Sequence, residues 1–542
     1  MRRSSSLLTN ARRRGALAVV GGAALALAFA APGDANASHR ASVARRPVTI
    51  PALQRWSPSR GDWRLGAGTR IVVPHETPVT LRASVQEAQK LAHDLAASLD
   101  APIPVVVDAV AEPGDIEMRL TGPSARLGRE GYRLDVGGTL TISAPTATGL
   151  FYGGRTVLQL LHQSRSIPSG VARDWPRYPQ RGLMVDASRT VYSTSWVLRE
   201  IRRLAALKLN VLHLHLTDDQ RWAITSRAFP DIVGSHPFTV GDIHRILRLA
   251  HRDHVTVIPE IEMPGHMAAF LKKHPGLILK PTGLVPPSTS ATYTTDKLDI
   301  TAPAALAAMR RVLEEYLPLF PGKYWDMGTD EYLSPAEYPI FPQLATYAIA
   351  KYGAGATPAD AIHGFINWVD GIVRSHGKTL RIWNDQVGGT GRVPVNRDVV
   401  IEWWDSFSPF GDTVTVSPET LIAHGYRVLN AGWYPNYYTS AIGPVSGKAS
   451  LPGVYTGWQV NEFDGNEFGK LVSSMQKVPA SSPGLLGSAL SIWGPLDETA
   501  AQTASGIEPH LAVLAQKTWG SPPPATAYSG FTRDARRVGL PS

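Results

Sequence analysis

The stretch YWDMGTDEYL, residues 324–333, starts as a short apolar run and ends beside two adjacent carboxylates, Asp330 and Glu331. Seven further runs of this kind occur after residue 181, and almost all of them end in Asp, Glu, Trp, Tyr or His. They are GLMVDAS from Gly182, NVLHLHLTD from Asn210, VTVIPEIEM from Val255, TLRIWND from Thr379, VVIEWWD from Val399, RVLNAGWY from Arg427 and GLLGSALSIWG from Gly484. Eight strands with long, partly helical connections predict a parallel (β/α)8 barrel. Its active site is expected at the carboxyl-terminal ends of the strands, where these side chains gather.

The remainder of the chain divides around this barrel. Residues 48–179 contain short β-like runs and two helical patterns, which predict a small α+β domain that carries no acid–base cluster. Two prolines in DWPRYPQ end that domain before the barrel, which is expected over 180–520. Residues 521–542 are expected to form a tail packed on the barrel. The predicted fold is therefore α/β, a (β/α)8 TIM barrel preceded by a small α+β domain.

The first 37 residues have the pattern of an export signal. A basic front is followed by the apolar run GALAVVGGAALALAFA and by the small residues ANA before Ser38. Arg13 and Arg14 also leave a twin-arginine signal open. Residues 38–47 read as a tether. We therefore expect a secreted protein that does not associate with a membrane after signal cleavage.

Charge and cysteine content exclude several classes of site. The 542 residues carry a net charge of +9 and no cysteine, which rules out disulfides and thiolate metal sites. Cleavage after residue 37 removes a net +4 and leaves +5. The remaining basic residues are scattered, which is typical of a solvated surface, so we expect no nucleic-acid partner.

The adjacency of Asp330 and Glu331 needs a physical explanation. Neighbouring residues of a strand point to opposite faces, so both side chains reach one pocket only if the backbone turns between strand and loop. Such a position indicates function. The alternative is an Asp-Glu pair that caps the helix that follows.

Two further groups of side chains allow both a functional and a structural interpretation. Six tryptophans lie near the ends of the later strands, where indole faces can bind sugar rings or simply fill a large core; they are Trp383, Trp403, Trp404, Trp433, Trp458 and Trp493. His213 and His215 share one strand face. They could bind zinc with help from Asp218 or Asp219, or form a hydrogen-bonded layer inside the barrel. His266, in a loop, could orient another side chain, touch substrate or have no special role.

Four segments in order resemble family 20 glycoside hydrolases, the β-N-acetylhexosaminidase group: RGLMVDASR, KLNVLHLHLTDDQRW, IPEIEMPGH and MGTDEY. The segment GYRLDVGGTLTISAPTATGLFYGGRTVLQLL resembles the non-catalytic domain that precedes the barrel in that family. The resemblance implies substrate-assisted catalysis, in which the 2-acetamido oxygen of the sugar attacks the anomeric carbon and an oxazolinium-like intermediate forms. Glu331 is then the general acid and later the base, and Asp330 orients the acetamide. We also expect the pKa of Glu331 to be raised by burial and by its like-charged neighbour.

The resemblance implies roles for further residues. Arg181 would hold sugar hydroxyls; Tyr434 would bond the acetamide carbonyl; Asp218, Asp219, Glu262 and His266 would surround the acid; and Trp383, Trp404 and Trp493 would enclose the sugar. The sequence departs from the common family pattern at Asp326 (for His), Thr329 (for Gly), Arg221 (for Gly), Pro495 (for Glu) and Asn436, a substrate-binding candidate where Asp is usual. A changed hydroxyl-binding shell should change which sugar fits.

These expectations favour a secreted exo-hydrolase that releases β-linked N-acetylhexosamine from glycans such as chitin fragments. A lacto-N-biosidase-like enzyme that releases a disaccharide is the alternative within the family, because GTDEY and the loss of the Glu at Pro495 suit it. Alternatives from other classes are a non-catalytic glycan-binding barrel and a metal-dependent amidohydrolase. We expect a carbohydrate substrate and neither a metal nor a cofactor; the sequence selects no oligomeric state.

Overall fold

The computed structural model describes residues 46–99, 102–283, 295–388, 391–405, 416–440, 449–463, 476–494 and 496–539. The expected signal peptide, most of the expected tether and Pro495 lie outside these ranges. Over the described ranges, no helix has the length and apolar character needed to cross a lipid bilayer.

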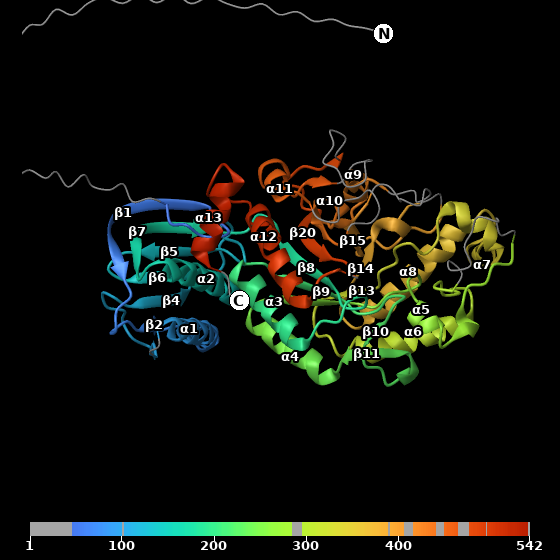
Figure 1. Cartoon of the computed structure of the whole chain (residues 1–542), viewed down its shortest axis with the longest axis horizontal. Helices are drawn as coiled ribbons and strands as arrows, with labels where there is room; N and C mark the ends of the chain where they lie inside the picture. Colours follow the sequence, from blue (N-terminus) through green and yellow to red (C-terminus); the bar gives the residue numbers. More distant parts are fainter. Residues whose placement is uncertain are drawn as a thin grey trace, which may run out of the picture. The chain divides into compact units, whose positions relative to one another are not determined.

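The amino-terminal domain is a seven-stranded sheet with two helices packed against it (Figure 1). The strands lie in the order β1-β7-β5-β6-β4-β2-β3, and alternation of buried and less buried residues in β5 (Tyr132–Val136) shows why such runs form strands. The other elements are β2 (Ile71–Val73), α1 (Pro78–Leu99), β3 (Val105–Val107), β4 (Ile116–Leu120), β6 (Leu140–Ala144) and α2 (Ala147–Gln163).

Two strands of this domain were not predicted from the sequence. β1 (Arg55–Arg64) and β7 (Ser166–Asp174) pair antiparallel, and β1 forms one edge of the sheet. Pro58, Gly61, Pro168 and Gly170 interrupt their alternation of apolar and polar residues. An edge strand tolerates proline because one of its sides needs no ladder hydrogen bonds, and the register of the pair shifts between Pro58 and Asp62.

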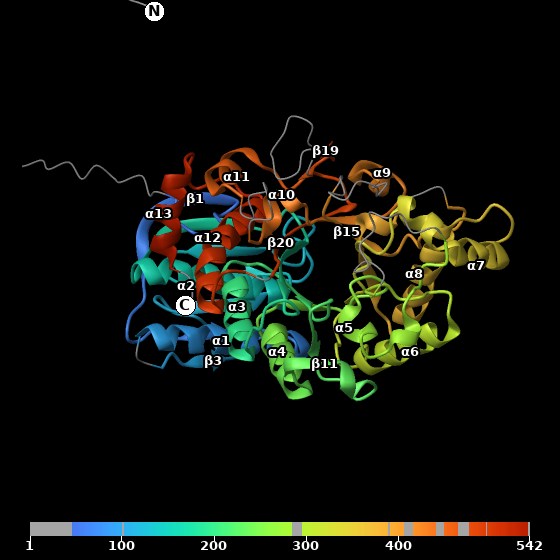
Figure 2. The same cartoon turned by 45° about the vertical axis from the view of Figure 1, so that its right-hand side comes forward.

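The second domain is a closed barrel of eight parallel strands, which confirms the predicted fold (Figures 1 and 2). Each predicted run forms one strand, and pairing of β16 with β20 closes the barrel. The strands are β8 (Gln180–Asp186), β9 (Val211–His215), β12 (Thr256–Glu260), β13 (Tyr324–Asp326), β14 (Thr379–Trp383), β15 (Val400–Trp403), β16 (Arg427–Asn430) and β20 (Leu485–Ile492).

Helices cover the outside of the barrel, and shorter elements fill the connections. The helices are α3 (Thr194–Ala206), α4 (Val240–Arg252), α6 (Pro303–Tyr316), α7 (Pro342–Tyr352), α8 (Pro358–Ser375), α9 (Pro418–Ala423), α11 (Leu451–Gly457) and α12 (Ala500–Trp519). The short elements are β10 (Trp222–Ile224), β11 (Val233–Phe238), α5 (Ala268–Leu271), α10 (Trp433–Asn436), β17 (Tyr437–Tyr438), β18 (Glu462–Phe463) and β19 (Gln476–Lys477).

Buried ion pairs join the two domains. Lys208 Nζ lies 2.9 Å from Asp174 Oδ2, and both side chains are fully buried. The carboxyl-terminal helix α13 (Tyr528–Val538) lies against α2 as well as α11, where the rings of Phe531 and Tyr455 are 4.5 Å apart. The tail therefore packs on both domains and not on the barrel alone.

Candidate active site

The backbone turns sharply after β13, as the adjacent carboxylates require. Gly328, Thr329 and Glu331 have φ angles of +68°, +86° and +48°. Gly328 is needed for space as well as conformation, because a Cβ atom there would lie 1.9 Å from Glu262 Oε2. The Asp326 carboxylate accepts a hydrogen bond of 2.9 Å from Gly328 N and so supports the turn. Asp326, one of the departures from the common pattern, thus helps to shape this turn.

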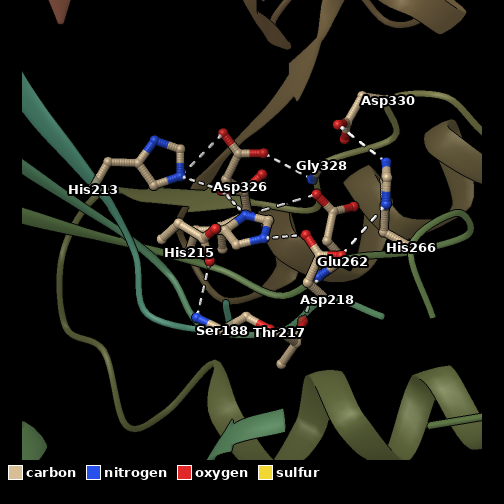
Figure 3. Close-up of polar contacts among 12 residues, drawn as sticks. Ser188, His213, His215, Thr217, Asp218, Glu262, His266, Asp326, Gly328 and Asp330 are labelled. Carbon is tan, nitrogen blue, oxygen red and sulfur yellow. Dashed lines mark hydrogen bonds and ion pairs between the residues drawn. The ribbon is translucent and has the colours of Figure 1, made fainter. Parts of the chain in front are cut away.

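The turn brings both carboxylates to one imidazole. His266 Nε2 lies 3.5 Å from Asp330 Oδ2, and its Nδ1 lies 3.5 Å from Asp218 Oδ1 (Figure 3). The same two nitrogens lie 3.3 Å from Glu331 Oε2 and 3.5 Å from Asp219 Oδ2, respectively. Burial would lower the pKa of His266, but the negative charges of Asp218 and Asp330 raise it well above its usual range. A protonated His266 therefore connects the four carboxylates, consistent with an orienting residue.

The two carboxylates have opposite pKa shifts, and the expectation for Glu331 was wrong. Burial raises the pKa of Asp330, and the charges of Glu260 and Glu331 add to this although His266 opposes it. For Glu331, burial would also raise the pKa, but contact with His266 and the positive charges of His266, Lys297 and Arg189 lower it below its usual value. The error came from counting the carboxylate neighbour while ignoring cations that only the fold brings near.

Glu262 and Asp218 are two further buried carboxylates beside His266 and the acid pair. Glu262 is buried, and its burial together with the charges of Asp330 and Glu260 raises its pKa well above the usual range. Asp218 contacts both His215 Nε2, at 2.9 Å, and Arg189, at 2.6 Å. Asp219 accepts a hydrogen bond of 2.9 Å from Ala268 N, which fixes the loop after His266.

An aromatic cluster lies beside the acid pair. Trp383, Trp404 and Tyr437 form its buried part, and the half-buried Trp433 and Trp493 pack against them. The rings of Trp404 and Tyr437 are nearly parallel, 6.3 Å apart. Of the six candidate tryptophans, Trp403 and Trp458 belong instead to the main hydrophobic core. The core-filling interpretation therefore applies to these two, and the sugar-binding interpretation remains for the other four.

The structure corrects the expected sugar-binding arginine. Arg181 is at the amino end of β8, fully buried, with its guanidinium 2.8 Å from Glu130 of the first domain and bonded to the carbonyl of Lys208. It joins the domains at the end opposite to the acid pair. Arg189, at the other end of the same motif RGLMVDASR, contacts Asp186 and Asp218 instead. The rule that barrel sites lie at the carboxyl ends of strands would have selected Arg189.

The structure records protein contacts for two further candidates, Asn436 and Tyr434. Asn436 Nδ2 donates a hydrogen bond of 3.4 Å to Asn430 Oδ1, and Asn436 Oδ1 accepts one of 3.3 Å from Ser488 Oγ. Tyr434 packs against the main hydrophobic core, whereas Tyr437 packs with the tryptophans of the cluster. After burial, which dominates, the charge of Asp330 contributes to the raised pKa of Tyr437, so this phenol is near the pair.

His213 and His215 form a charged layer inside the barrel. His215 Nδ1 lies 2.7 Å from Glu260, and His213 lies 3.0 Å from the same carboxylate, which also accepts a 2.7 Å hydrogen bond from Trp383. Burial would lower the pKa of His213, but Glu402 and Glu260 raise it to about 10. Three side-chain groups are compact enough for an ion: His213–Asp326–Glu402, His215–Glu260–Glu262 and Asp218–Asp219–His266. In each of the three groups the imidazole already contacts a carboxylate, as in the hydrogen-bonded layer that is the alternative to a metal site.

An acid pair and an aromatic cluster at the carboxyl ends of barrel strands define a carbohydrate-active barrel enzyme. Residues 178–522 match the family model "Glycosyl hydrolase family 20, catalytic domain", and residues 46–175 match "Glycosyl hydrolase family 20, domain 2". The chain therefore belongs to glycoside hydrolase family 20.

Individual relatives come from two kinds of enzyme. A lacto-N-biosidase of Bifidobacterium bifidum is 32% identical over 96% of this chain and 44% of its own length. A β-N-acetylhexosaminidase of Cellulomonas fimi is 26% identical over 80% of this chain and 82% of its own. The chain spans about half the length of several other curated relatives, such as β-hexosaminidase subunit A1 of Dictyostelium discoideum at 56%.

Solved structures share the fold. An N-acetyl-β-hexosaminidase of Streptomyces plicatus, in complex with Thio-NAglucal, superimposes with a TM-score of 0.66 at 26% identity, covering 90% of this chain and 93% of that one. An exo-β-N-acetylglucosaminidase of Vibrio harveyi superimposes with a TM-score of 0.72 at 20% identity, covering 94% and 79%.

Proposed function

We propose that the protein hydrolyses β-linked N-acetylhexosaminides by substrate-assisted catalysis. Glu331 protonates the leaving oxygen and then activates water, and Asp330 holds the acetamide N–H while the acetamide oxygen attacks the anomeric carbon. The aromatic cluster encloses the sugar. Tyr437 donates a hydrogen bond to the acetamide carbonyl, and Arg189 donates hydrogen bonds to sugar hydroxyls. The family membership and the geometry of the pair support this assignment.

The observation that carries the proposal is the shared imidazole contact of Asp330 and Glu331. Acetamide and leaving oxygen sit on neighbouring sugar carbons, so the two groups that serve them must lie a short distance from each other. Both carboxylates lie within 3.5 Å of His266 Nε2, which satisfies that demand. An intramolecular nucleophile held in line can contribute on the order of 7–11 kcal/mol, more than proton transfer supplies.

The test compares substrates with and without the N-acyl group. The protein should hydrolyse nitrophenyl N-acetyl-β-glucosaminide or its disaccharide analogue, should cleave nitrophenyl β-glucoside at a far lower rate, and should be inhibited by a thiazoline that mimics the oxazoline. Equal rates on both sugars would contradict substrate assistance. Absence of turnover on every N-acetylhexosaminide, with measurable glycan binding, would favour the non-catalytic barrel.

A second candidate is release of a disaccharide, as in lacto-N-biosidases. The B. bifidum relative matches along 96% of this chain, and Asn436, which stands where an Asp usually contacts the terminal sugar, is hydrogen-bonded to Asn430 and Ser488. When a hydroxyl of that sugar already carries galactose, as in lacto-N-biose, no side chain is needed to hydrogen-bond it. Hydrolysis of nitrophenyl lacto-N-bioside, with little activity on the monosaccharide, would establish this specificity.

Export of the protein, by the general or the twin-arginine route, is proposed from the amino-terminal sequence. Fractionation of expressing cells followed by amino-terminal sequencing of the mature chain tests it, and a start at Ser38 is expected. A chain that begins at Met1 in the cytoplasmic fraction would contradict it.

A further inference from the structure

Arg221 holds an unusual number of backbone carbonyls for one side chain. Its guanidinium donates to Ser188 O at 3.1 Å, Thr190 O at 3.0 Å and Ser235 O at 3.0 Å, and also to Ala187 O. The side chain is nearly inaccessible to solvent. Three of the four carbonyls belong to residues 187–190, the segment that follows β8, so Arg221 fixes the path of that segment.

The main chain of Arg221 strengthens the same connection. Its carbonyl accepts a hydrogen bond of 2.6 Å from Ser188 Oγ and one of 3.2 Å from Asp218 N. One residue therefore ties three places together: the segment after β8, the turn after β9 that carries Asp218, and β11 through Ser235.

Arg189 is the functional side chain that this segment carries. Its Nη1 lies 3.1 Å from Asp186 and its Nη2 lies 2.6 Å from Asp218. Its guanidinium also sits 5.4 Å from the ring centre of Trp493. Arg189 is thus bracketed on both sides in sequence by carbonyls that Arg221 binds, and any shift of those carbonyls moves the arginine relative to the aromatic cluster.

Gly234 makes room for the stem of Arg221. A Cβ atom on Gly234 would lie 2.2 Å from Arg221 Cγ and 2.9 Å from its Cδ. Gly234 is not among the glycines with a positive φ, so its backbone conformation does not require glycine. Glycine is required at this position because Arg221 approaches so closely. The two residues form a matched pair.

We propose that Arg221 is a positioning residue that sets the place of Arg189 against the bound sugar. This proposal rests on the proposed function, in which Arg189 binds hydroxyls, and it goes beyond it by assigning a role to a residue that touches no substrate. Small displacements of a binding group reduce turnover sharply, so removal of the clamp is expected to lower kcat/KM about 10–100-fold.

The first experiment is a double-mutant cycle with Arg189. Arg221→Ala, Arg189→Lys and the double variant are compared on whichever N-acetylhexosaminide the wild type hydrolyses. Because Arg221 acts through Arg189, the double variant should lose no more kcat/KM than the worse single variant. Losses that multiply would overturn the proposal, since a general loss of structure would add to the Arg189 effect.

The second experiment uses Gly234→Ala, which displaces Arg221 without altering any charged group. It should lower kcat/KM in the wild-type background and change it little in the Arg221→Ala background, where the Cγ that it strikes is gone. An equal loss in both backgrounds would overturn the link. In the Arg189→Lys background Gly234→Ala should cause no further loss of kcat/KM, and this comparison keeps the test decisive if Arg221→Ala fails to fold.

Arg203→Ala is the matched control, because Arg203 is also buried and binds Glu200 and the carbonyl of Ala504, on the outside of the barrel. It should lower the melting temperature and leave kcat/KM unchanged. Hydrogen exchange of residues 187–190 should increase in Arg221→Ala and not in Arg203→Ala. This readout needs no substrate, so it separates failure of the clamp from failure of the proposed function; unchanged exchange would overturn the clamp.

Discussion

Oε2 of Glu331 lies 3.3 Å from Nε2 of His266. The same imidazole also contacts the carboxylates of Asp330, Asp218 and Asp219. The contact with His266 stabilises the ionised form of Glu331, whereas the proposed reaction begins with the protonated form. The free enzyme therefore loses its general acid as the pH rises through the lowered pKa of Glu331, and kcat/KM should decline on that side.

Lys297→Met should move the alkaline limb of the kcat/KM profile to higher pH. Lys297 is buried, its Nζ lies 3.1 Å from the main-chain oxygen of Glu331, and its charge helps to lower the pKa of that acid. Removing a positive charge makes proton loss harder, so Glu331 remains protonated to higher pH. Lys272→Met, an exposed lysine beyond α5, is the control and should leave the limb in place. A shift to lower pH would contradict the assignment of that limb to Glu331.

Exchange of the two carboxylates for amides should separate their roles. Glu331→Gln should reduce turnover by about 10²–10⁴-fold on substrates with poor leaving groups and much less on dinitrophenyl glycosides, which need no acid. Asp330→Asn, and equally Asp330→Ala, should damage turnover about as badly as loss of Glu331 and for every leaving group, because positioning of the acetamide is lost. Steady-state kinetics across a series of phenols measures this. Near-normal kcat in the Asp330 variants would contradict its acetamide role.

The two arginines of the RGLMVDASR motif should separate stability from activity. Arg181→Met leaves the half-buried Glu130 without its cationic partner and should reduce the free energy of unfolding by about 3–5 kcal/mol, with kcat/KM nearly unchanged in the folded fraction. Arg189→Met should lower kcat/KM in the folded fraction, because the proposed contact with sugar hydroxyls is lost. Chemical denaturation and kinetics on the same preparations measure both quantities, and a catalytic loss confined to the Arg181 variant would reverse the assignment made from the structure.

The fold could be predicted because each barrel strand is short, apolar and ended by a polar or aromatic residue, a pattern that survives in isolation. β1 and β7 were missed because Pro58 and Pro168 conceal strands whose pairing is decided by the sheet. β1 lies at the sheet edge and is exposed along most of its length, so its sequence shows no alternation, whereas β7 lies between β1 and β5 and its alternation is interrupted by Pro168 and Gly170.

Site residues were predicted correctly where neighbouring positions in the sequence identified them. They were missed where only the folded structure shows which side chains lie close together. Asp330, Glu331 and His266 were identified from motif and position, and the structure brings them together. Arg181 and Arg189 stand at the two ends of one strand motif, and a motif match alone does not say which end faces the reaction. The pKa direction of Glu331 depends on Lys297 and Arg189, which are 34 and 142 positions away in the sequence.

Tyr437→Phe should reduce activity more than Tyr434→Phe. Tyr437 packs with Trp404 and Trp493, and we propose that its hydroxyl binds the acetamide, while Tyr434 packs against the main core. Loss of one hydrogen bond to a reacting group is expected to lower kcat about 10²–10³-fold if the bond strengthens as the acetamide oxygen attacks. Paired kinetics of the two variants, with melting temperatures as controls, measures this. The larger loss in Tyr434→Phe would return the role to the residue chosen from sequence.

Acid should remove a specific part of the stability of the barrel through Glu402. Burial would raise the pKa of this carboxyl, but Arg381, at 2.5 Å, and His213 lower it to about 2, from its ordinary value of 4.5. A group whose pKa is depressed by folding stabilises the folded state above its unfolded pKa, and the contribution disappears as the pH falls towards the folded value. The difference corresponds to about 3 kcal/mol at neutral pH.

Glu402→Gln should therefore unfold more easily than the wild type at neutral pH, and the difference in unfolding free energy should narrow as the pH falls from 4.5 towards 2. Denaturant titrations at a series of pH values measure it. Glu314→Gln, on the exposed side of α6, is the control and should follow the wild type at every pH. A gap between Glu402→Gln and the wild type that stays constant down to pH 2 would mean that the variant loses packing and not the ionised carboxylate, because only the charged form binds Arg381 and His213.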